Sequence, residues 1–322
     1  MGWLVTGGAG YIGAHVVAAM RAAGQDVVVL DDLSTGCEKR VAGVPLVVGS
    51  TLDRELVGRT LHEHAVRGVV HLAAKKAVEE SVRDPLTYYR ENVEGLRCLL
   101  EAAVSEGVDS FVFSSSAALY GESDVEQVDE NTVCRPINPY GRTKLIGEQM
   151  VADVASATGL RYASLRYFNV AGCATPELAD RGVSNLVPMV FQRLVQQQSP
   201  VIFGDDYPTH DGTCVRDFIH VQDIASAHAV AAAALAEGCI TDLVANIGRG
   251  EGVSVREMIA VIREVTGTAG EEWSEPTVLD RRPGDPPRVV ASAEVIERAL
   301  GWRASFAVRE MVESAWAGWP RP

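Results

Sequence analysis

The sequence predicts an α/β fold: a doubly wound parallel sheet followed by a smaller C-terminal lobe. Two observations predict it. Strand-like and helix-like stretches alternate as far as about residue 113, which implies right-handed crossovers and a parallel sheet. The chain also has 322 residues, more than one hydrophobic core usually holds. We expect residues 1–170 to form the sheet domain and residues 171–322 mainly the lobe, with a segment around 213–248 either in the lobe or returned to the sheet.

The first expected strand, residues 3–6, runs into a glycine-rich turn and a helix. Gly7, Gly10 and Gly13 would let the backbone turn tightly, approach a pyrophosphate and pack the helix on the strand, and the helix N-terminus would supply amide donors. The second strand, residues 26–30, ends at Asp31, at the spacing of a residue that holds a ribose diol. Its carboxylate would repel a 2′-phosphate, which favours NAD over NADP. The alternative is a tight strand-to-helix turn with a surface aspartate.

The alternation continues through the first half of the chain. We expect strands at residues 46–48, 68–72 and 110–113, and helices at residues 53–64 and 85–104. Ligand groups gather where parallel strands end. The ends of these strands carry Ser50 and Thr51, Ala73 and Ala74 with Lys76, and the run Ser114, Ser115 and Ser116. His71 lies in an apolar strand, and we expect it to pack there.

Tyr140 and Lys144 are four residues apart in a stretch that follows Asn138 and Pro139. If this stretch opens a helix, the phenol and the ammonium lie on one face, one turn apart. A cation this close would lower the pKa of the tyrosine toward neutrality and allow Tyr140 to act as an acid or a base. The alternative is a buried aromatic residue beside a surface lysine.

Composition and charge exclude several classes of protein. The net charge of −14 argues against a nucleic-acid or anionic-membrane surface, so any phosphate must be met by local donors. The six cysteines are scattered and form neither a C-x-x-C pair nor a metal cluster, which indicates reduced thiols and no metal site. No apolar run reaches membrane-spanning length and no leader pattern is visible, so we expect a cytoplasmic protein.

Several motifs occur together in order. They are Gly7-x-x-Gly10-x-x-Gly13, the run from Asp31 to Ser34, the serine run with Tyr120-Gly121, Tyr140-x-x-x-Lys144, the runs 76–82 and 85–89, and Arg166-Tyr167-Phe168-Asn169. With these motifs the chain resembles the extended short-chain dehydrogenase/reductase family, and within it the UDP-glucose 4-epimerases. The resemblance runs from residue 3 to about residue 316. It implies a Rossmann-type sheet with tightly bound NAD and a C-terminal lobe that binds the UDP-sugar.

The resemblance also implies a catalytic mechanism. Ser116 would hydrogen-bond the reacting sugar hydroxyl, Tyr140 would accept its proton, and Lys144 would bind the nicotinamide ribose and lower the pKa of the tyrosine. A transient 4-keto sugar would turn over in the pocket, and NAD would be regenerated in each turnover. Without Tyr140 and Lys144, Ser116 would be interpreted as a strand-end serine that satisfies the backbone. The activity implied is that of an isomerase of galactose and related carbohydrate metabolism, which converts UDP-galactose to UDP-glucose.

The cofactor site implied by the resemblance draws on the ends of most strands. Its residues are Gly7, Gly10, Tyr11, Ile12, Gly13, Asp31, Asp32, Ser50, Thr51, Leu72, Ala73, Ala74, Lys76, Asn92, Ser114, Tyr140, Lys144 and Tyr167.

The alternating pattern loosens after Asn169, where the lobe is expected to begin. The resemblance places the substrate on Ser116, Tyr140, Phe168, Asn169, Asn185, Leu186, Phe203, Arg216, Arg282, Asp285 and Val289. The two arginines also follow from the residues themselves, because an acidic protein that binds a diphosphate needs guanidinium groups that converge on it. The alternative role for either arginine is a salt bridge at the surface. We also expect a helix that ends at residue 196 and further helices at residues 224–236, 254–265 and 293–300. Strands are expected at residues 201–204 and 244–248.

Four residues depart from the usual epimerase pattern. Ser50 replaces a usual aspartate near the adenine, Ala118 replaces a hydroxyl residue, and Phe218 replaces a tyrosine. Val289 stands where a large or a small residue controls the space for the sugar 2-substituent. Because valine is shorter than tyrosine, we hypothesise that N-acetylated sugars also enter.

Three rival functions remain. The chain could epimerise another UDP-sugar, such as UDP-N-acetylglucosamine or a UDP-pentose, because pocket volume discriminates poorly. A nucleotide-sugar dehydratase needs a carboxylate directly after Ser116, where Ala117 and Ala118 stand. A non-catalytic NAD-binding sensor has no need of Ser116, Tyr140 and Lys144 together. The resemblance also implies a homodimer through helices at residues 85–104 and 139–158.

Overall fold

The central sheet of the protein has seven parallel strands. The computed structural model describes residues 1–282 and 284–320. The strand order is β10-β6-β5-β4-β1-β2-β3, and every pairing in the sheet is parallel. The strands are β1 (Gly2–Thr6), β2 (Asp26–Asp31), β3 (Leu46–Val48), β4 (Val66–His71), β5 (Ser110–Ser116), β6 (Arg161–Tyr167) and β10 (Asp242–Ile247). The order reverses between β1 and β4, so the predicted doubly wound parallel sheet is confirmed.

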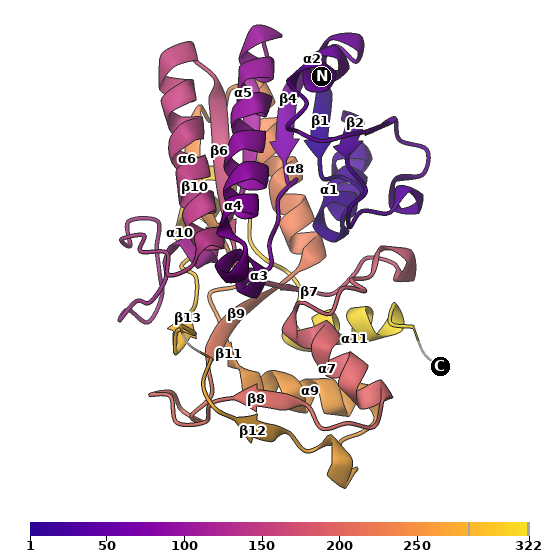
Figure 1. Ribbon diagram of the computed structural model, residues 1–322, viewed down its shortest axis with the longest axis vertical. Helices are drawn as coiled ribbons and strands as arrows, with labels where there is room; N and C mark the ends of the chain where they lie inside the picture. Colours follow the sequence, from indigo (N-terminus) through magenta and orange to yellow (C-terminus); the bar gives the residue numbers. More distant parts are fainter. Residues whose placement is uncertain (283, 321–322) are drawn as a thin grey trace.

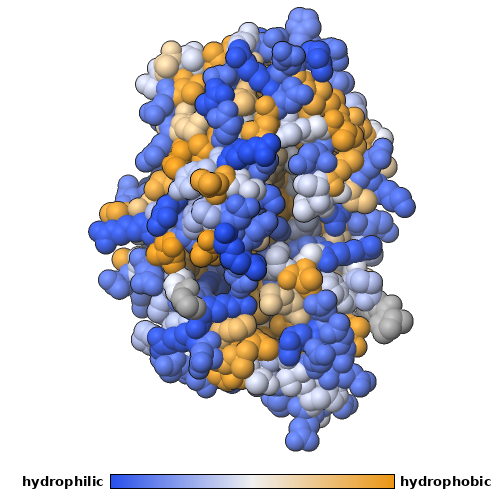
Figure 2. Space-filling view, in the orientation of Figure 1, coloured by the Kyte–Doolittle hydropathy of each residue, from blue (hydrophilic) through white to orange (hydrophobic). Residues whose placement is uncertain are grey.

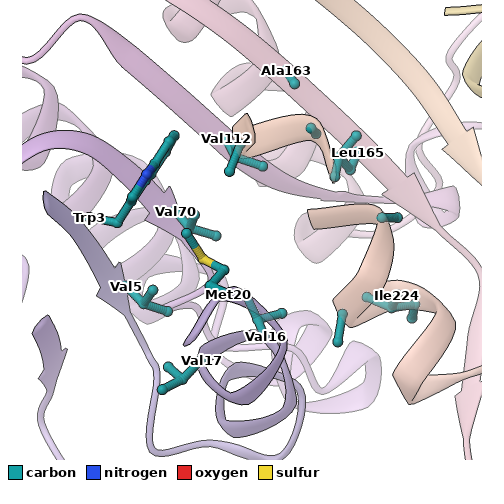
Figure 3. Close-up of a cluster of buried hydrophobic side chains, with 14 of the residues drawn as sticks. Trp3, Val5, Val16, Val17, Met20, Val70, Val112, Ala163, Leu165 and Ile224 are labelled. Atoms are coloured by element: carbon teal, nitrogen blue, oxygen red, sulfur yellow. The ribbon is translucent and has the colours of Figure 1, made fainter. Parts of the chain in front are cut away.

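Helices cover both faces of this sheet. One face carries α1 (Tyr11–Ala22), α8 (Val221–Glu237) and α10 (Glu294–Leu300), and the other carries α2 (Arg54–Glu63), α5 (Gly95–Ser105) and α6 (Pro139–Thr158). Each face has its own hydrophobic core: the first core lies under α1, α8 and α10, and the second under α2, α5 and α6. Successive strand residues point to opposite faces, so Val5 packs in the first core and Leu4 in the second. Figure 3 shows the first core, where Met20 of α1 and Ile224 of α8 face the strands. The two cores hold the strand ends in fixed positions.

The start of α6 is defined by local sequence. Asn138 caps the helix, because its Oδ1 accepts a hydrogen bond from the amide of Gly141 at 2.8 Å, and Pro139 occupies the first turn. Gly159 ends the helix with a φ of 77°. Tyr140 is therefore placed in the first turn of α6, directly at the end of the sheet where β5 and β6 finish.

The second part of the molecule is a lobe below the sheet (Figure 1). Its strands are β7 (Asn169–Ala171), β8 (Val201–Phe203), β9 (Val215–His220), β11 (Gly252–Ser254), β12 (Thr277–Leu279) and β13 (Arg288–Val289), and its helices are α7 (Leu186–Val195), α9 (Val255–Thr266) and α11 (Val308–Ala317). β9 pairs with β7, β11 and β13, and β8 pairs with β12. Phe191, Met258 and Met311 fill the core of the lobe.

The chain crosses between the two parts several times. β7 and β9 belong to the small sheet, but α8 then packs on α1 and β10 pairs with β6 at the edge of the large sheet. The segment 213–248 is therefore divided between the two parts. β7 follows β6 directly and pairs with the second half of β9, which brings β9 next to the end of β6.

Several elements differ from the sequence prediction. The helix expected at 85–104 consists of α4 (Pro85–Tyr88), a π-helical segment η2 (Tyr89–Glu94) and α5. The sequence did not predict β6 as a strand, because its polar residues hide the apolar pattern. The remaining short elements are α3 (Val78–Arg83), η1 (Glu38–Val41), η3 (Ala117–Leu119), η4 (Pro176–Leu178) and η5 (Glu272–Ser274). Within the described residues, the length and apolar character needed to cross a membrane are found together in no helix.

Candidate active site

The turn between β1 and α1 is packed too closely for side chains. A Cβ on Gly13 would overlap the carbonyl oxygen of Gly7, and a Cβ on Gly7 would come within 2.7 Å of the amide nitrogen of Ala73. Gly7 also has a φ of 70°. No side chain caps α1 at Gly10. The turn therefore presents backbone amides at a helix N-terminus, the arrangement that fits a pyrophosphate.

Asp31 lies beside this turn at the end of β2. Its carboxylate accepts hydrogen bonds from the amides of Ala9 (2.9 Å) and Leu33 (2.8 Å), and the residue is buried. Asp32 instead accepts from the amide and hydroxyl of Ser34. Two backbone amides fix the Asp31 carboxylate beside the glycine turn, which is the placement that a ribose diol requires. These residues fit the dinucleotide that the sequence predicts.

The remaining expected cofactor residues lie at the ends of β3 and β4 and on η2. Thr51 is buried beside Gly95, and the loop after β4 carries Leu72, Ala73, Ala74 and Lys76. Asn92 is engaged with the protein itself. Its side chain accepts from the amide of Lys75 (2.8 Å) and donates to the carbonyl of Lys75 (2.9 Å) and to the hydroxyl of Thr143 (3.0 Å). Asn92 thus ties the loop after β4 to α6.

Ser116, Tyr140 and Lys144 meet at the junction of β5 and α6. The Ser116 hydroxyl hydrogen-bonds the Tyr140 phenol. The Lys144 ammonium donates to the carbonyl of Ser114 at 2.8 Å and lies 6.0 Å from the centroid of the Tyr140 ring. The structure therefore brings together the three residues that the sequence predicts as catalytic.

One expectation about these residues is wrong for the protein alone. Lys144 was expected to lower the pKa of Tyr140, but burial raises that pKa, and only the hydrogen bond from Ser116 opposes the increase. Desolvation of the phenol is the largest cause, and the ammonium group of Lys144 donates to the Ser114 carbonyl. Burial also lowers the pKa of Lys144, to about 8, while the negative charge of Glu148 raises it. Desolvation is therefore the largest cause of the pKa shift of both Tyr140 and Lys144.

A cavity of about 320 Å³ lies where the two parts of the molecule meet. Figure 2 shows a recess in the surface between the sheet domain and the lobe below it. The cavity is lined by twelve of the predicted residues: Tyr11, Ile12, Lys76, Ser116, Tyr140, Tyr167, Phe168, Asn169, Asn185, Arg216, Asp285 and Val289. The sheet domain therefore contributes the candidate catalytic groups and the lobe contributes the opposite wall.

The lobe side of the cavity carries a close ion pair. Arg216 on β9 donates to the carboxylate of Asp285, and both side chains are largely buried. The Asn185 side chain donates to Asp180 at 2.9 Å. Arg216 and Asp285 would present a cation and an acceptor to a diphosphate and its ribose.

Leu186, Phe203 and Arg282 are not among the residues that line this cavity, so their place in the substrate site stays a prediction. The guanidinium of Arg282 covers the ring of Phe203, 3.8 Å from its centroid, and lies 3.9 Å from the carboxylate of Glu79. The ring of Phe203 is thus covered by a side chain of the protein.

The sequence analysis did not assign other lining residues to the site. They are Val78, Ala117, Ala118, Gly121, Ile137, Asn138, Val170, Gly284 and Pro286. Most are apolar or small and carry no signal of function. Asn138 could have been assigned to the site from the sequence. An asparagine followed by a proline is a helix-start signal, and the helix that it starts carries Tyr140. Among the described residues, no three acidic, histidine or cysteine side chains form a group that could hold a metal ion.

Comparison with known proteins agrees with this geometry. Residues 3–248 match the model of the NAD dependent epimerase/dehydratase family. The UDP-glucose 4-epimerase of Azospirillum brasilense is 46% identical over 309 residues, which cover 93% of this chain and 86% of that protein.

Two solved structures are also similar along nearly the whole chain. The UDP-glucose-4-epimerase of Stenotrophomonas maltophila, with bound NAD and formylated UDP-arabinopyranose, has a TM-score of 0.93 and 39% identity, and 98% of this chain and 97% of that chain are covered. The UDP-Glc/GlcNAc 4-epimerase of Campylobacter jejuni has a TM-score of 0.85 and 34% identity, with 98% of each chain covered. The glycine turn, the Ser116–Tyr140–Lys144 group and these similarities lead to one conclusion: the chain belongs to the NAD dependent epimerase/dehydratase family.

Proposed function

We propose that this protein epimerises a UDP-hexose at C4 with NAD, interconverting UDP-galactose and UDP-glucose through a transient 4-keto sugar. One observation carries the proposal. Ser116 and Tyr140 line the same cavity as Arg216 and Asp285, so a nucleotide sugar held by the lobe would present its hexose to the tyrosine.

The residues around the glycine turn would hold NAD. Amides at the start of α1 would meet the pyrophosphate, and the Asp31 carboxylate would bind a ribose diol. When bound, NAD supplies a hydride acceptor and, after reduction, a hydride donor. Ile12 at the start of α1 and Tyr167 at the end of β6 both line the cavity.

Tyr140 would accept the proton of the sugar hydroxyl at its phenolic oxygen. Ser116 is hydrogen-bonded to that phenol and can contact the same hydroxyl. Lys144 is anchored on Ser114, and its positive charge lies on the same side of the cavity as Tyr140. Burial opposes ionisation of Tyr140, so the base has to be generated by charges that approach it when the ligands bind.

Arg216 would bind the diphosphate and Asp285 the uridine ribose. The guanidinium fork matches phosphate oxygens, and the net charge of −14 makes a locally placed cation necessary. Arg216 is paired with Asp285. The pair would hold both groups ready for a ligand that carries phosphate next to a diol.

A dehydratase reaction is disfavoured by the cavity wall. Eliminating water requires a further acid or base next to the sugar. The residues that follow Ser116 and line the cavity are Ala117 and Ala118, which carry neither.

A second candidate substrate is an N-acetylated UDP-hexose. Val289 lines the cavity from β13 and is only partly exposed, and a valine leaves more room for a 2-substituent than a tyrosine would. A similar structure at 34% identity is named a UDP-Glc/GlcNAc 4-epimerase. The test compares UDP-galactose with UDP-N-acetylgalactosamine in wild type and in Val289→Tyr. Selective loss of the N-acetylated activity in the variant supports this substrate, and no N-acetylated turnover in the wild type overturns it.

We also infer a homodimer that works in the cytoplasm. Leu86 at the start of the helical stretch 85–104 is 79% exposed, although it is apolar. All six cysteines are free thiols, as a reducing compartment allows. Sedimentation equilibrium should give twice the chain mass, and a monomer across the micromolar range would contradict the dimer.

The activity itself is tested with purified protein and UDP-galactose. UDP-glucose should form and be converted by a coupling enzyme that is specific for it, and the product of that second reaction is measured. Tyr140→Phe serves as the control for contaminating epimerase. If neither UDP-hexoses nor UDP-pentoses react, even after NAD is added, the proposed function is wrong.

A further inference from the structure

Three consecutive serines of β5 contact three residues of α6 that are spaced one helical turn apart. Ser116 hydrogen-bonds the phenol of Tyr140, and the carbonyl of Ser114 accepts from Lys144 at 2.8 Å. The Ser115 hydroxyl donates to the carboxylate of Glu148 at 2.5 Å. Tyr140, Lys144 and Glu148 are four residues apart, so they share one face of the helix. The first two belong to the candidate active site, and the third has no role in the mechanism described above.

Glu148 is held from two directions by Arg166 on β6. Arg166 Nε donates to Oε1 at 2.9 Å and Nη2 donates to Oε2 at 2.6 Å. The side chains of Glu148 and Arg166 are 8% and 7% exposed. Arg166 Nη1 also donates to the hydroxyl of Tyr120 at 3.0 Å, which donates to the Oδ1 of Asn246 at 2.7 Å. The carboxylate is therefore fixed between β5, β6 and α6.

The position of Glu148 matters because a buried ammonium needs an anion nearby. Burial disfavours the charged form of Lys144, and the negative charge of Glu148 is what opposes it. The other titratable groups around Lys144 and Glu148 come from several neighbouring elements. They are Tyr140 on α6, His71 on β4, Tyr88 on α4, His228 on α8, Cys134 in the loop before α6, and Tyr162, Arg166 and Tyr167 on β6.

We propose that Glu148 is a positioning residue of the epimerase reaction: through Ser115 it fixes the end of β5 against α6, and as a buried anion one turn from Lys144 it maintains the ammonium form of that lysine. This inference rests on the proposed function. Glu148 does not line the cavity, so it acts through Ser115 and Lys144 and not on the sugar.

The mechanical part follows from strand geometry. Ser115 lies between Ser114 and Ser116, so a bond that holds Ser115 to Glu148 limits movement of both neighbours relative to the helix. Those neighbours set where Lys144 and the Tyr140 phenol lie. Small displacements of catalytic groups lower the rate of the chemical step strongly. Glu148 therefore affects kcat without contacting the substrate.

Four variants of the full-length protein separate the two parts of the proposal. Ser115→Ala removes the tether and keeps both charges. Glu148→Gln removes the anion and leaves Arg166 buried without its partner, so it carries a risk of misfolding. Glu148→Gln combined with Arg166→Met removes both charges and avoids that risk. Arg166→Lys keeps the charges but loses the two-pronged geometry.

Asp223→Asn is the matched control. Asp223 is also a buried carboxylate, but its partners are the amide and hydroxyl of Ser305 and the amide of Phe306, which are not partners of Lys144. It reports what loss of a buried acid does to folding alone. All proteins are compared by circular dichroism, thermal unfolding, bound NAD, kcat, KM and the pH profile of kcat.

Ser115→Ala should lower kcat about three- to tenfold with KM for UDP-galactose nearly unchanged. The double variant should lower kcat at least about tenfold and move the alkaline limb of the kcat profile down by about one pH unit, because Lys144 loses its proton more easily. In Arg166→Lys and Asp223→Asn the alkaline limb should stay in place.

A folded double variant with wild-type kcat and an unmoved alkaline limb would overturn the proposal, as would an equal shift in Asp223→Asn. If Glu148→Gln does not fold, Ser115→Ala and the double variant decide. Wild-type turnover of UDP-galactose is measured in parallel, so its absence would identify failure of the proposed function and not of this inference.

Discussion

The ammonium group of Lys144 lies 2.8 Å from the carbonyl oxygen of Ser114 and donates a hydrogen bond to it. Ser114 lies two residues before Ser116 on β5. The backbone of the strand that carries Ser116 therefore also positions Lys144. Burial nevertheless raises the pKa of Tyr140 in the protein alone. It also places a positive charge beside the cavity before any ligand binds.

Tyr140→Phe should abolish most of the activity. The ring remains and keeps its packing, but the phenolic oxygen that would accept the proton is lost. General acid–base catalysis of this kind is worth roughly 10²–10⁴-fold, so kcat should fall by that factor while KM changes little. The measurement is steady-state kinetics with UDP-galactose, with thermal unfolding as the control for folding. A variant with more than half of wild-type kcat would show that Tyr140 is not the base.

Arg216→Gln should weaken substrate binding. A charge-assisted, two-pronged contact to phosphate is worth about 1.5–3 kcal/mol, which corresponds to a KM about 12- to 140-fold higher. Arg281→Gln is the matched control, because Arg281 pairs with Asp206 and covers Tyr207 outside the cavity. Equal KM values for the two variants would exclude Arg216 from the diphosphate site.

Gly13→Ala should reduce both stability and bound NAD. The added Cβ would overlap the Gly7 carbonyl oxygen, and such overpacking costs about 1–3 kcal/mol. Gly58→Ala in α2 is the control, because no atom lies within 4 Å of its Cβ position. The control should gain about 0.5–1 kcal/mol, since glycine is unfavourable inside a helix. Thermal unfolding and the absorbance ratio at 260 and 280 nm measure both effects. Wild-type NAD content in Gly13→Ala would contradict the glycine-turn assignment.

The protein should lose stability as the pH falls from about 6.5 to about 4. Burial lowers the pKa of His71 to about 3 and of His220 and His228 to about 4. Below the ordinary histidine pKa of about 6.5 the unfolded chain takes up these protons and the folded chain does not, so protonation favours unfolding.

Asp217 acts in the opposite direction. Burial raises its pKa to about 6, so the folded chain gains relative stability as this carboxyl is protonated below that pH. Urea unfolding between pH 7 and pH 4.5 measures the balance. His228→Asn should reduce the number of protons taken up on unfolding by about one. A proton uptake unchanged from wild type would show that His228 is not held neutral by burial.

The sequence could predict the elements whose signals are local. Asn138 and Pro139 start α6 and Gly159 ends it, and the observed helix agrees with the range 139–158 that the resemblance implies. Asp31 was recognised because it ends an apolar strand at a fixed distance from the glycine turn. These features are set by neighbours in the chain.

Other features depend on contacts between distant residues. Arg166 makes β6 look polar, and its burial is explained by partners that are distant in the chain: Glu148, 18 residues earlier on a helix, and Tyr120. Asn92 was expected at the cofactor, but its partners Lys75 and Thr143 come together only in the fold. The raised pKa of Tyr140 likewise depends on how completely the fold desolvates it.

The most direct test of the central claim is turnover of UDP-galactose in D₂O with no NAD added, followed by proton NMR. We expect UDP-glucose that keeps protium at C4, because hydride would leave and return within one site whose NAD stays bound. Tyr140→Phe should form no product under the same conditions. Deuterium at C4, or no turnover until NAD is supplied in each cycle, would contradict the account.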